Sequence, residues 1–429
     1  MKLFIDNFAK IRKANIDIDG ITVIAGENNT GKSTIGKILF SLFNSTAYIE
    51  DKIQDQRYSE IRRLCISLIR NYTVHNGITS LNYIAFAKKI WEPVLKLLDN
   101  NTYTTEESRY VIHAVLALSG KIFENESDWK EIEDTLVYRI DEIVNLSDDK
   151  LMLELLTRYF GRVFHDQINS LYLPDSRTYI DLNIKKRNLK MGFYDNACIH
   201  LEKDFHVVNK AIYIDNPFIV DKLDRGNSSD EMEYHLINLI ISSSVGDVMD
   251  GLFDSVLVKD KLSDIFNMLD SVVPGDIIKS NENEFYLKQE NMHRPVAFER
   301  LSTGIKSFLI IKMLLEKRII REKDMLILDE PEIHLHPQWQ IVYAELVVLL
   351  QKYFNLSIVI TTHSPYFLDA IHLYSVKHGI ADKAKYYMTF ENDKWSELED
   401  VTDNLELIYQ RMASPIQILD TLRYELNHQ

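Results

Sequence analysis

The chain has 429 residues and carries 49 Lys and Arg against 64 Asp and Glu, which gives a net charge of −15. Such an acidic balance repels phosphate backbones on average and argues against non-specific nucleic-acid binding. The start, MKLFIDNF, lacks a leader pattern, no apolar run reaches the roughly 20 residues that cross a bilayer, and Cys65 and Cys198 are too few for a disulfide framework. We therefore expect a cytoplasmic protein with reduced thiols and no membrane partner.

The first predicted elements are strands that lead into a phosphate-binding loop. Residues 1–25 alternate and then turn apolar, which predicts two or three short strands, the last at 21–25. GENNTGKS follows and matches G-x-x-x-x-G-K-S, and the amphipathic run TIGKILFSLF predicts a helix whose N-terminal dipole faces the loop. The predicted nucleotide-binding residues are Gly26, Glu27, Asn28, Asn29, Thr30, Gly31, Lys32, Ser33 and Thr34.

The chemistry of this loop follows from its residue types. Gly26 and Gly31 permit backbone angles that point successive N–H groups at phosphate oxygens. Lys32 supplies a positive charge to the β- and γ-phosphates, and the Ser33 hydroxyl is placed to bind Mg²⁺. The loop alone predicts a nucleoside triphosphate with Mg²⁺, and does not distinguish a transporter from a kinase, a motor or a switch.

Residues 46–205 are expected to form a mostly helical insertion. In SEIRRLCISLIR the apolar residues recur at helical spacing, and similar stripes follow with interruptions every 15–20 residues. No heptad pattern persists over three or four repeats, so we expect a compact domain rather than a coiled-coil arm. Near its end, NIKKRNLK carries Lys185, Lys186, Arg187 and Lys190, which is either a solvated loop or hairpin or a local patch for DNA.

The rest of the core is predicted at 206–395. KAIYIDNP, EFYLKQ and PVAFERL are typical of strands, and a further helical stretch lies near 230–268. DMLILDE and LSIVITTHS are short apolar runs without alternation, as in parallel strands covered on both faces. With residues 1–45, this segment predicts an α/β fold with a mixed and parallel sheet and flanking helices, followed by C-terminal helices at 396–429.

Polar residues with catalytic potential follow the two most apolar strands. Asp329 and Glu330 come after MLIL, at the carboxyl end where open α/β sheets bind ligands. Asp329 is the expected Mg²⁺ carboxylate, and Glu330 is the expected general base that activates water. His363 ends the strand of ITTHSP and is placed to contact the γ-phosphate or the attacking water, although a lone histidine there is often structural.

Two further stretches have both a functional and a plain interpretation. Ser302, Thr303 and Gly304 open the helical run after ERL and form an N-terminal anion site, or simply an N-cap. His334 and His336 in HLHP lack the neighbouring His or Cys residues of a metal site, so we do not assign a metal to them.

In chain order, GENNTGKS, LSTGIKS, LILDEPEIHLHP and ITTHSP resemble the Walker A, signature, Walker B with D-loop and switch-histidine motifs of ATP-binding-cassette (ABC) ATPases. The resemblance covers residues 1–45 and 270–390. It implies a head-to-tail dimer in which ATP on Lys32 and Ser33 of one subunit is capped by Ser302 and Gly304 of another. It also implies that His363 senses the γ-phosphate.

The details are similar to the soluble branch that includes the RecF, SMC and OLD families. LSTGIKS departs from the LSGGQ of transporter subunits, and DEPEIHLHP resembles the soluble branch. The compact insertion is similar to stand-alone AAA family ATPases of anti-phage systems, such as PtuA of Septu and AriA of PARIS. No Asp-x-Asp of a Toprim nuclease occurs in the 66 residues after His363, and no Q-loop glutamine is identifiable, so Asp215 and Asn216 are the expected residues of that lid position.

We therefore expect an ATP-driven dimerising switch that controls a separately encoded effector, a nuclease or a toxin, in phage defence. The alternatives are a RecF-like repair or replication ATPase that acts directly on DNA, a nucleotide-binding subunit of a transporter, and a non-catalytic scaffold locked by ATP. The motifs are shared by all of these, so the sequence does not identify the effector or the trigger.

Overall fold

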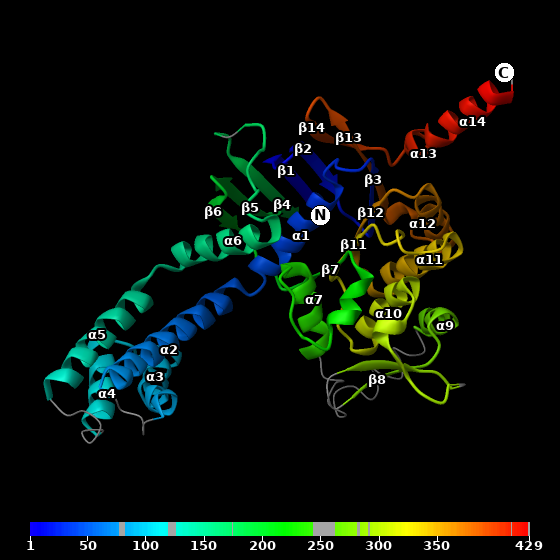
Figure 1. The fold of residues 1–429 in the computed structure, drawn as a ribbon. Helices are drawn as coiled ribbons and strands as arrows, with labels where there is room; N and C mark the ends of the chain where they lie inside the picture. Colours follow the sequence, from blue (N-terminus) through cyan, green and yellow to red (C-terminus); the bar gives the residue numbers. More distant parts are fainter. Residues whose placement is uncertain are drawn as a thin grey trace. The chain divides into compact units, whose positions relative to one another are not determined.

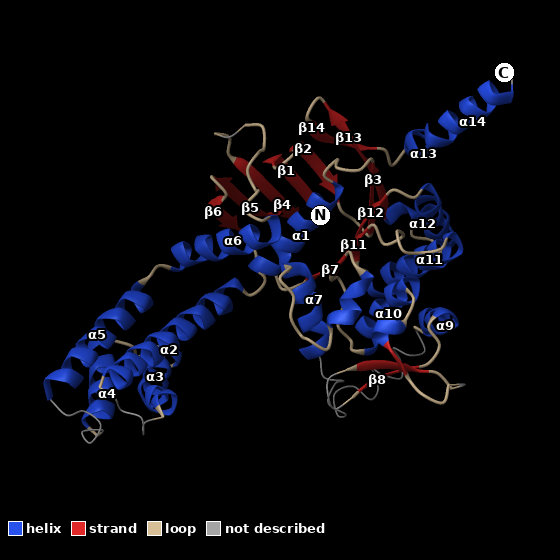
Figure 2. Cartoon of the chain, viewed as in Figure 1, coloured by secondary structure: helices blue, strands red, loops and turns tan. Residues whose placement is uncertain are grey.

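The computed structural model describes residues 1–76, 82–118, 126–173, 175–242, 262–280, 284–290, 292–412 and 414–427 (Figures 1 and 2). The contacts divide the chain into two compact units. The larger unit contains Met1–Ala47 and Leu156–Gln429, and the smaller one contains Tyr48–Leu155. Among the described residues, no helix combines the length and the apolar composition needed to cross a membrane.

A sheet of 11 strands organises the larger unit. Five neighbouring strands (β13, β3, β12, β11 and β7) run parallel, so their carboxyl ends lie along the same edge. The remaining pairs are antiparallel, apart from the parallel pair β2–β14. The spatial order is β6 (Ala197–Lys203), β5 (Arg187–Tyr194), β4 (Thr178–Ile184), β1 (Lys2–Phe8), β2 (Ile11–Asp17), β14 (Trp395–Asp400), β13 (Ala384–Asn392), β3 (Ile21–Gly26), β12 (Ser357–Thr362), β11 (Met325–Asp329) and β7 (Ala211–Ile214).

Helices cover both faces of the parallel strands, because alternate side chains of each strand point to opposite faces. Val23, Leu326 and Ile358 pack in one cluster with helices α10 (Thr303–Glu316), α11 (Pro337–Phe354) and α12 (Pro365–Lys377). On the other face, α1 (Lys32–Thr46) approaches the sheet closely at Gly36. A Cβ on Gly36 would lie 2.9 Å from Ile327 Cγ2, so glycine permits this close approach.

Smaller elements complete the larger unit. A second sheet has three strands in the order β10–β9–β8. The other described elements that lie wholly in the larger unit are β8 (Asp276–Lys279), β9 (Phe285–Lys288), β10 (Val296–Ala297), the 3-10 turns η1 (Pro217–Lys222), η2 (Phe298–Arg300) and η3 (Ala381–Lys383), and the helices α7 (Glu231–Ser242), α9 (Ser263–Val272), α13 (Glu406–Met412) and α14 (Ser414–Asn427).

The smaller unit is helical and has its own core. Ile61, Cys65 and Ile69 form a buried stripe of α2 at helical spacing, and they pack with apolar residues of α3, α4 and α5. Burial raises the pKa of the Cys65 thiol to about 12. The helices are α2 (Ile49–His75), α3 (Tyr83–Asp99), α4 (Thr105–Ala117), α5 (Glu126–Asn145) and α6 (Asp148–Phe164), the last of which continues into the larger unit.

The fold class predicted from the sequence is confirmed, since the sheet is mixed, has a parallel part and is flanked by helices. The expected insertion at 46–205 differs from the structure, in which the compact helical unit ends at Leu155 and β4, β5 and β6 join the main sheet. The basic cluster lies at the β4–β5 turn, where Lys185 and Lys186 have positive φ angles of 49° and 67°. These strands alternate in burial, a pattern that the helical assignment of this stretch missed.

The later boundaries also differ from those expected. Residues 395–400 form β14, so the tail expected to be helical at 396–429 begins within a strand that pairs with β13. Of the helical stretch near 230–268, α7 and α9 are described, and residues 243–261 lie outside the described part.

A side chain of α1, that of Asn44, hydrogen-bonds the backbone of the edge strand β7. Asn44 Nδ2 donates to the carbonyl of Ala211 at 2.8 Å, and the Ala211 N–H donates back to Asn44 Oδ1 at 3.2 Å. Both residues are buried, so water does not replace these hydrogen bonds readily. The amide of Asn44 thus fixes α1 to the strand beside β11.

We expect Asn44→Ala to lower the free energy of unfolding by about 2–3 kcal/mol, because it leaves a buried N–H and a buried C=O without this partner. Urea unfolding followed by circular dichroism measures the change. Asn15→Ala, at an exposed position of β2, serves as the control. Equal stability of the two variants would contradict the role assigned to Asn44.

Candidate functional site

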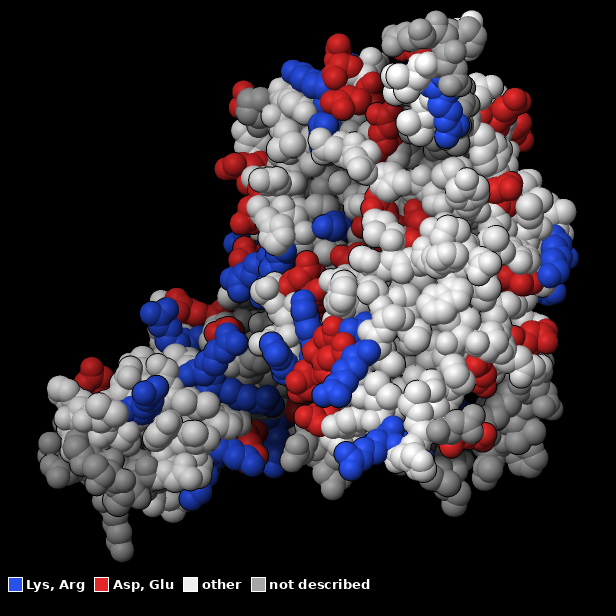
Figure 3. Space-filling view, turned by 45° about the vertical axis from the view of Figure 1, so that its right-hand side comes forward, with Lys and Arg blue, Asp and Glu red and all other residues white. Residues whose placement is uncertain are grey.

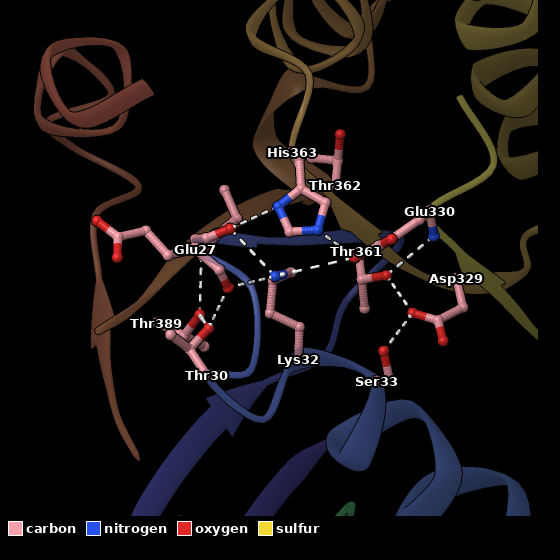
Figure 4. A network of polar contacts seen from close by, with 12 residues as sticks. Glu27, Thr30, Lys32, Ser33, Asp329, Glu330, Thr361, Thr362, His363 and Thr389 are labelled. Atoms are coloured by element: carbon pink, nitrogen blue, oxygen red, sulfur yellow. Dashed lines mark hydrogen bonds and ion pairs between the residues drawn. The ribbon is translucent and has the colours of Figure 1, made fainter. Parts of the chain in front are cut away.

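The loop after β3 has the geometry of a phosphate-binding loop. Gly26, Asn29 and Gly31 have positive φ angles of 152°, 64° and 82°. A Cβ at Gly26 would lie 2.2 Å from Thr389 Oγ1, so glycine is required there. Lys32 Nζ donates to the carbonyls of Gly26 at 3.1 Å and Glu27 at 2.6 Å (Figure 4). Burial lowers the pKa of Lys32, and nearby carboxylates oppose that effect.

Two residues that the sequence analysis missed support this loop. Thr389 on β13 has its hydroxyl 2.6 Å from that of Thr30, which also donates to the Glu27 carbonyl at 2.7 Å. Lys10, in the β1–β2 turn, donates to the carbonyl of Asn29 at 3.3 Å. Neither residue belongs to a sequence motif. Strand pairing brings both of them to the loop from distant parts of the sequence. The loop residues predicted from the sequence lie together here, with Glu27, Asn28 and Asn29 exposed and Thr34 in the first turn of α1.

Asp329, at the end of β11, lies opposite the first turn of α1. Ser33 Oγ donates to Asp329 Oδ1 at 3.0 Å, and the hydroxyl of Thr361 donates to the same oxygen. Tyr213 lies on β7 and was missed by the sequence analysis. Its hydroxyl donates to Asp329 Oδ2 over 2.6 Å. These residues fit a small divalent cation, because Ser33 and Asp329 bring two hard oxygens together.

Glu330 and His363 meet beside Lys32. Figure 4 shows the His363 ring between the loop and Glu330. His363 Nδ1 lies 2.9 Å from the Gly26 carbonyl, and Nε2 is hydrogen-bonded to Glu330 Oε1. Because a carbonyl only accepts, Nδ1 carries the hydrogen of its contact with Gly26. Lys32 Nζ is 3.9 Å from Glu330, which has a positive φ of 51°.

The two residues expected at the lid position follow β7. The parallel pairing of Ile214 with Leu328 brings Asp215 to the same edge of the sheet as Asp329. Local desolvation and the negative charges of Asp329 and Asp230 raise the pKa of Asp215 to about 6, although its side chain reaches solvent. The side chain of Asn216 accepts from the Phe218 N–H at 2.9 Å and caps η1.

The three signature residues are not joined to the phosphate loop by any hydrogen bond of the described residues. Ser302 is exposed at the N-cap of α10, and its side chain makes no capping hydrogen bond. Gly304 packs against Trp339, whose ring a Cβ would approach within 2.7 Å. The N-terminus of α10 thus carries an exposed hydroxyl, that of Ser302.

The histidines of HLHP have structural roles. The His334 ring packs against Phe218 with centroids 5.7 Å apart, and His336 Nδ1 accepts from the Gln338 N–H at 3.4 Å. Within the described ranges, no group of three His, Cys, Asp or Glu side chains is arranged to hold a metal. Burial raises the pKa of the Cys198 thiol to about 11, as expected of an inert thiol.

The chain is similar to a curated relative over part of its length. Septu protein PtuA of Bacillus thuringiensis is 30% identical over 140 residues, which are 29% of this chain and 34% of that protein. The chain thus matches about a third of the length of this curated relative.

Solved SMC heads are also similar, at low identity. An SmcHead bound to the C-winged helix domain of ScpA has a TM-score of 0.42 and 10% identity, over 93% of this chain and 97% of that one. The SMC head domain from Thermotoga maritima has a TM-score of 0.37 and 11% identity, over 93% and 98%. The fold assignment rests on the strand order and not on these scores. The model of the AAA ATPase domain matches residues 1–368, and the chain belongs to this family.

Proposed function

We propose that this chain binds and hydrolyses Mg²⁺-ATP, and that ATP-driven dimerisation lets it control a separately encoded effector, a nuclease or a toxin, in anti-phage defence. The observation that carries the proposal is the meeting of the phosphate-loop lysine, an acidic pair and a histidine at the carboxyl ends of three neighbouring parallel strands. Membership of the AAA ATPase family supports it.

Binding begins with an exchange of partners on the loop. The ammonium group of Lys32 leaves the carbonyls of Gly26 and Glu27 and binds the β- and γ-phosphate oxygens, while loop N–H groups and the α1 N-terminus bind the rest. Ser33 and Asp329 would hold the cation, and Asp215, at the same edge of the sheet, would add a carboxylate near it. Mg²⁺ neutralises phosphate charge when it is bound.

Glu330 acts as the general base in this proposal. Its Oε1 is hydrogen-bonded to His363 Nε2, and this oxygen must be released before it can contact the attacking water. Binding of the γ-phosphate gives the His363 ring a new acceptor and so releases Glu330. The contact between these two residues therefore keeps the site inactive before ATP binds.

The exposed signature turn supports a head-to-tail dimer. Ser302 and Gly304 lie at a helix N-terminus that lacks a local capping partner, so they are suited to contact the phosphates held by another copy of the chain. We infer that each hydrolytic site is composite, with Lys32 from one subunit and Ser302 from its partner.

The net charge of −15 favours a protein effector over direct action on DNA. On the face of the larger unit in Figure 3, Asp and Glu lie among Lys and Arg rather than leaving a continuous basic surface. In the basic cluster, Lys190 is paired with Glu202 at 3.2 Å, which leaves the hairpin tip with a short exposed group of cations. The partial similarity to Septu protein PtuA supports a role in defence.

Glu330→Gln is expected to lower the rate of hydrolysis at least about a hundredfold, because the amide cannot accept the proton of the attacking water. ATP binding should persist, and the ATP-bound dimer should accumulate in analytical ultracentrifugation. Phosphate release measures the rate. Hydrolysis by this variant at the wild-type rate would exclude Glu330 as the base.

Mixing two inactive variants tests the composite site. Ser302→Arg blocks the cap and Lys32→Met blocks the phosphate loop, so each variant alone should be inactive. An equal mixture should recover roughly a quarter of the wild-type activity, since half of the dimers are mixed and each mixed dimer has one intact site. No recovery at any mixing ratio would contradict sites shared between subunits.

The Asp215→Asn substitution is expected to raise the stability of the fold while weakening the use of Mg²⁺ in hydrolysis. Because the pKa of Asp215 is raised in the folded chain to about 6, the folded state binds more protons than the unfolded state between about pH 4 and 6, and stability falls as the pH rises through this window. Without metal at pH 7, the Asn variant should therefore unfold at a higher temperature than the wild type. It should also need more Mg²⁺ for half-maximal hydrolysis. An equal shift in unfolding temperature at pH 4 and pH 7 would contradict this explanation.

A further inference from the structure

A buried carboxylate that belongs to none of the roles assigned above lies beneath the switch histidine. Glu332 is only 4% exposed and lies in the turn between β11 and α11. Its Oε1 accepts from the Thr362 hydroxyl at 2.5 Å, from the His363 N–H at 2.8 Å and from the Ser364 N–H at 3.3 Å. A single oxygen thus fixes the backbone of the turn that carries His363.

The other oxygen of the same group is left out of this arrangement. Oε2 of Glu332 is buried, and no described residue donates a hydrogen bond to it. Burial raises the pKa of Glu332, and its hydrogen bonds with Thr362, His363 and Ser364 oppose that effect. A buried carboxyl group with one unsatisfied oxygen is costly for a fold, so its retention calls for an explanation beyond packing.

A second side chain joins the same two turns. Gln340, on α11, accepts from the Ser364 hydroxyl at 2.8 Å and donates to the carbonyls of Glu332 at 3.3 Å and Leu335 at 3.2 Å. Hydrogen bonds of two side chains, Glu332 and Gln340, therefore connect the turn after Glu330 to the turn around His363. A displacement of one turn must displace the other.

We propose that Glu332 is a positioning residue, which holds the backbone of His363 so that its ring reaches both the phosphate loop and Glu330. The ring must keep Nδ1 at 2.9 Å from the Gly26 carbonyl while Nε2 contacts Glu330. An error of about 1 Å in such a ring costs up to about a hundredfold in rate. The inference rests on the proposed hydrolysis, which it deepens by naming the residue that sets the geometry of the switch.

The first test compares two substitutions of the same residue. Glu332→Met keeps the size but removes the acceptor, and it should lower kcat by about tenfold to a hundredfold while changing ATP affinity less than about threefold. Glu332→Gln retains an oxygen that can accept the same three hydrogen bonds, so the kcat of this variant should stay within about threefold of the wild-type value. Loss in both variants would overturn the proposal, because the acceptor would then not be the property that matters.

A double-mutant cycle distinguishes positioning from simple loss of stability. If Glu332 acts through His363, Glu332→Met combined with His363→Ala should be no slower than His363→Ala alone. Multiplicative losses would overturn the proposal. Glu345→Met is the matched control, because Glu345 is a half-buried carboxylate of α11 that accepts from Lys377 of α12 at 2.8 Å, away from the strand ends. It should change stability without changing kcat.

Amide hydrogen exchange gives a readout that does not depend on turnover. In the full-length protein without nucleotide, Glu332→Met should accelerate exchange at the His363 and Ser364 amides, while Glu332→Gln and Glu345→Met should not. Unchanged exchange in Glu332→Met would overturn the positioning role. If these amides respond but the wild-type protein does not hydrolyse ATP, the proposed function fails and the structural assignment of Glu332 stands.

Discussion

The site depends on one constraint, which is that β3, β12 and β11 are adjacent and parallel. Register pairs Ala25 with Thr362 and Asp329 with Thr361, so the three strands end together. The phosphate loop, the acidic pair and the histidine are the continuations of these ends. An antiparallel partner at any of these positions would have sent one group to the opposite edge of the sheet. The hydrogen bonds of the parallel ladder thus align the chemistry before any ligand arrives.

Around this edge, charges are neutralised by neighbours within the chain. The carboxylate of Asp329 receives three hydroxyl hydrogen bonds, Lys32 lies among backbone carbonyls, and Glu330 is hydrogen-bonded to His363. Each of these arrangements stabilises the resting site and must be exchanged when a nucleotide binds. The free energy of nucleotide binding therefore depends on the difference between the two sets of partners, and not on the strength of either set alone.

Much of this edge could be predicted from the sequence because its residues follow short apolar strands within dense motifs. The strand MLIL and the pair Asp329–Glu330 specify both a location and a chemistry. Tyr213, Thr389 and Lys10 could not be predicted in the same way. Each is an ordinary residue for its strand or turn, and it reaches the site only through pairings between segments far apart in the sequence.

The end of the helical insertion could not be located from the sequence for a related reason. The strands from 178 to 203 alternate apolar with polar or small residues, but their partner β1 begins at residue 2. A local pattern does not show whether a hairpin belongs to an insertion or to a sheet formed by the first residues of the chain. Glu332 is a different case. It lies within a motif that the sequence made evident, but its three hydrogen-bond donors come from the end of another strand, β12, and could not be predicted from the motif.

The floor of the phosphate loop is made late in synthesis. Thr30 and Thr389 are 359 residues apart, and Thr389 lies beyond residue 368, where the family match ends. At about 5–20 residues per second, a ribosome needs roughly 20–70 s to travel from one to the other. For all of that time the nascent loop lacks the strand that packs against Gly26. The loop therefore takes the conformation described here only after residue 389 has been synthesised.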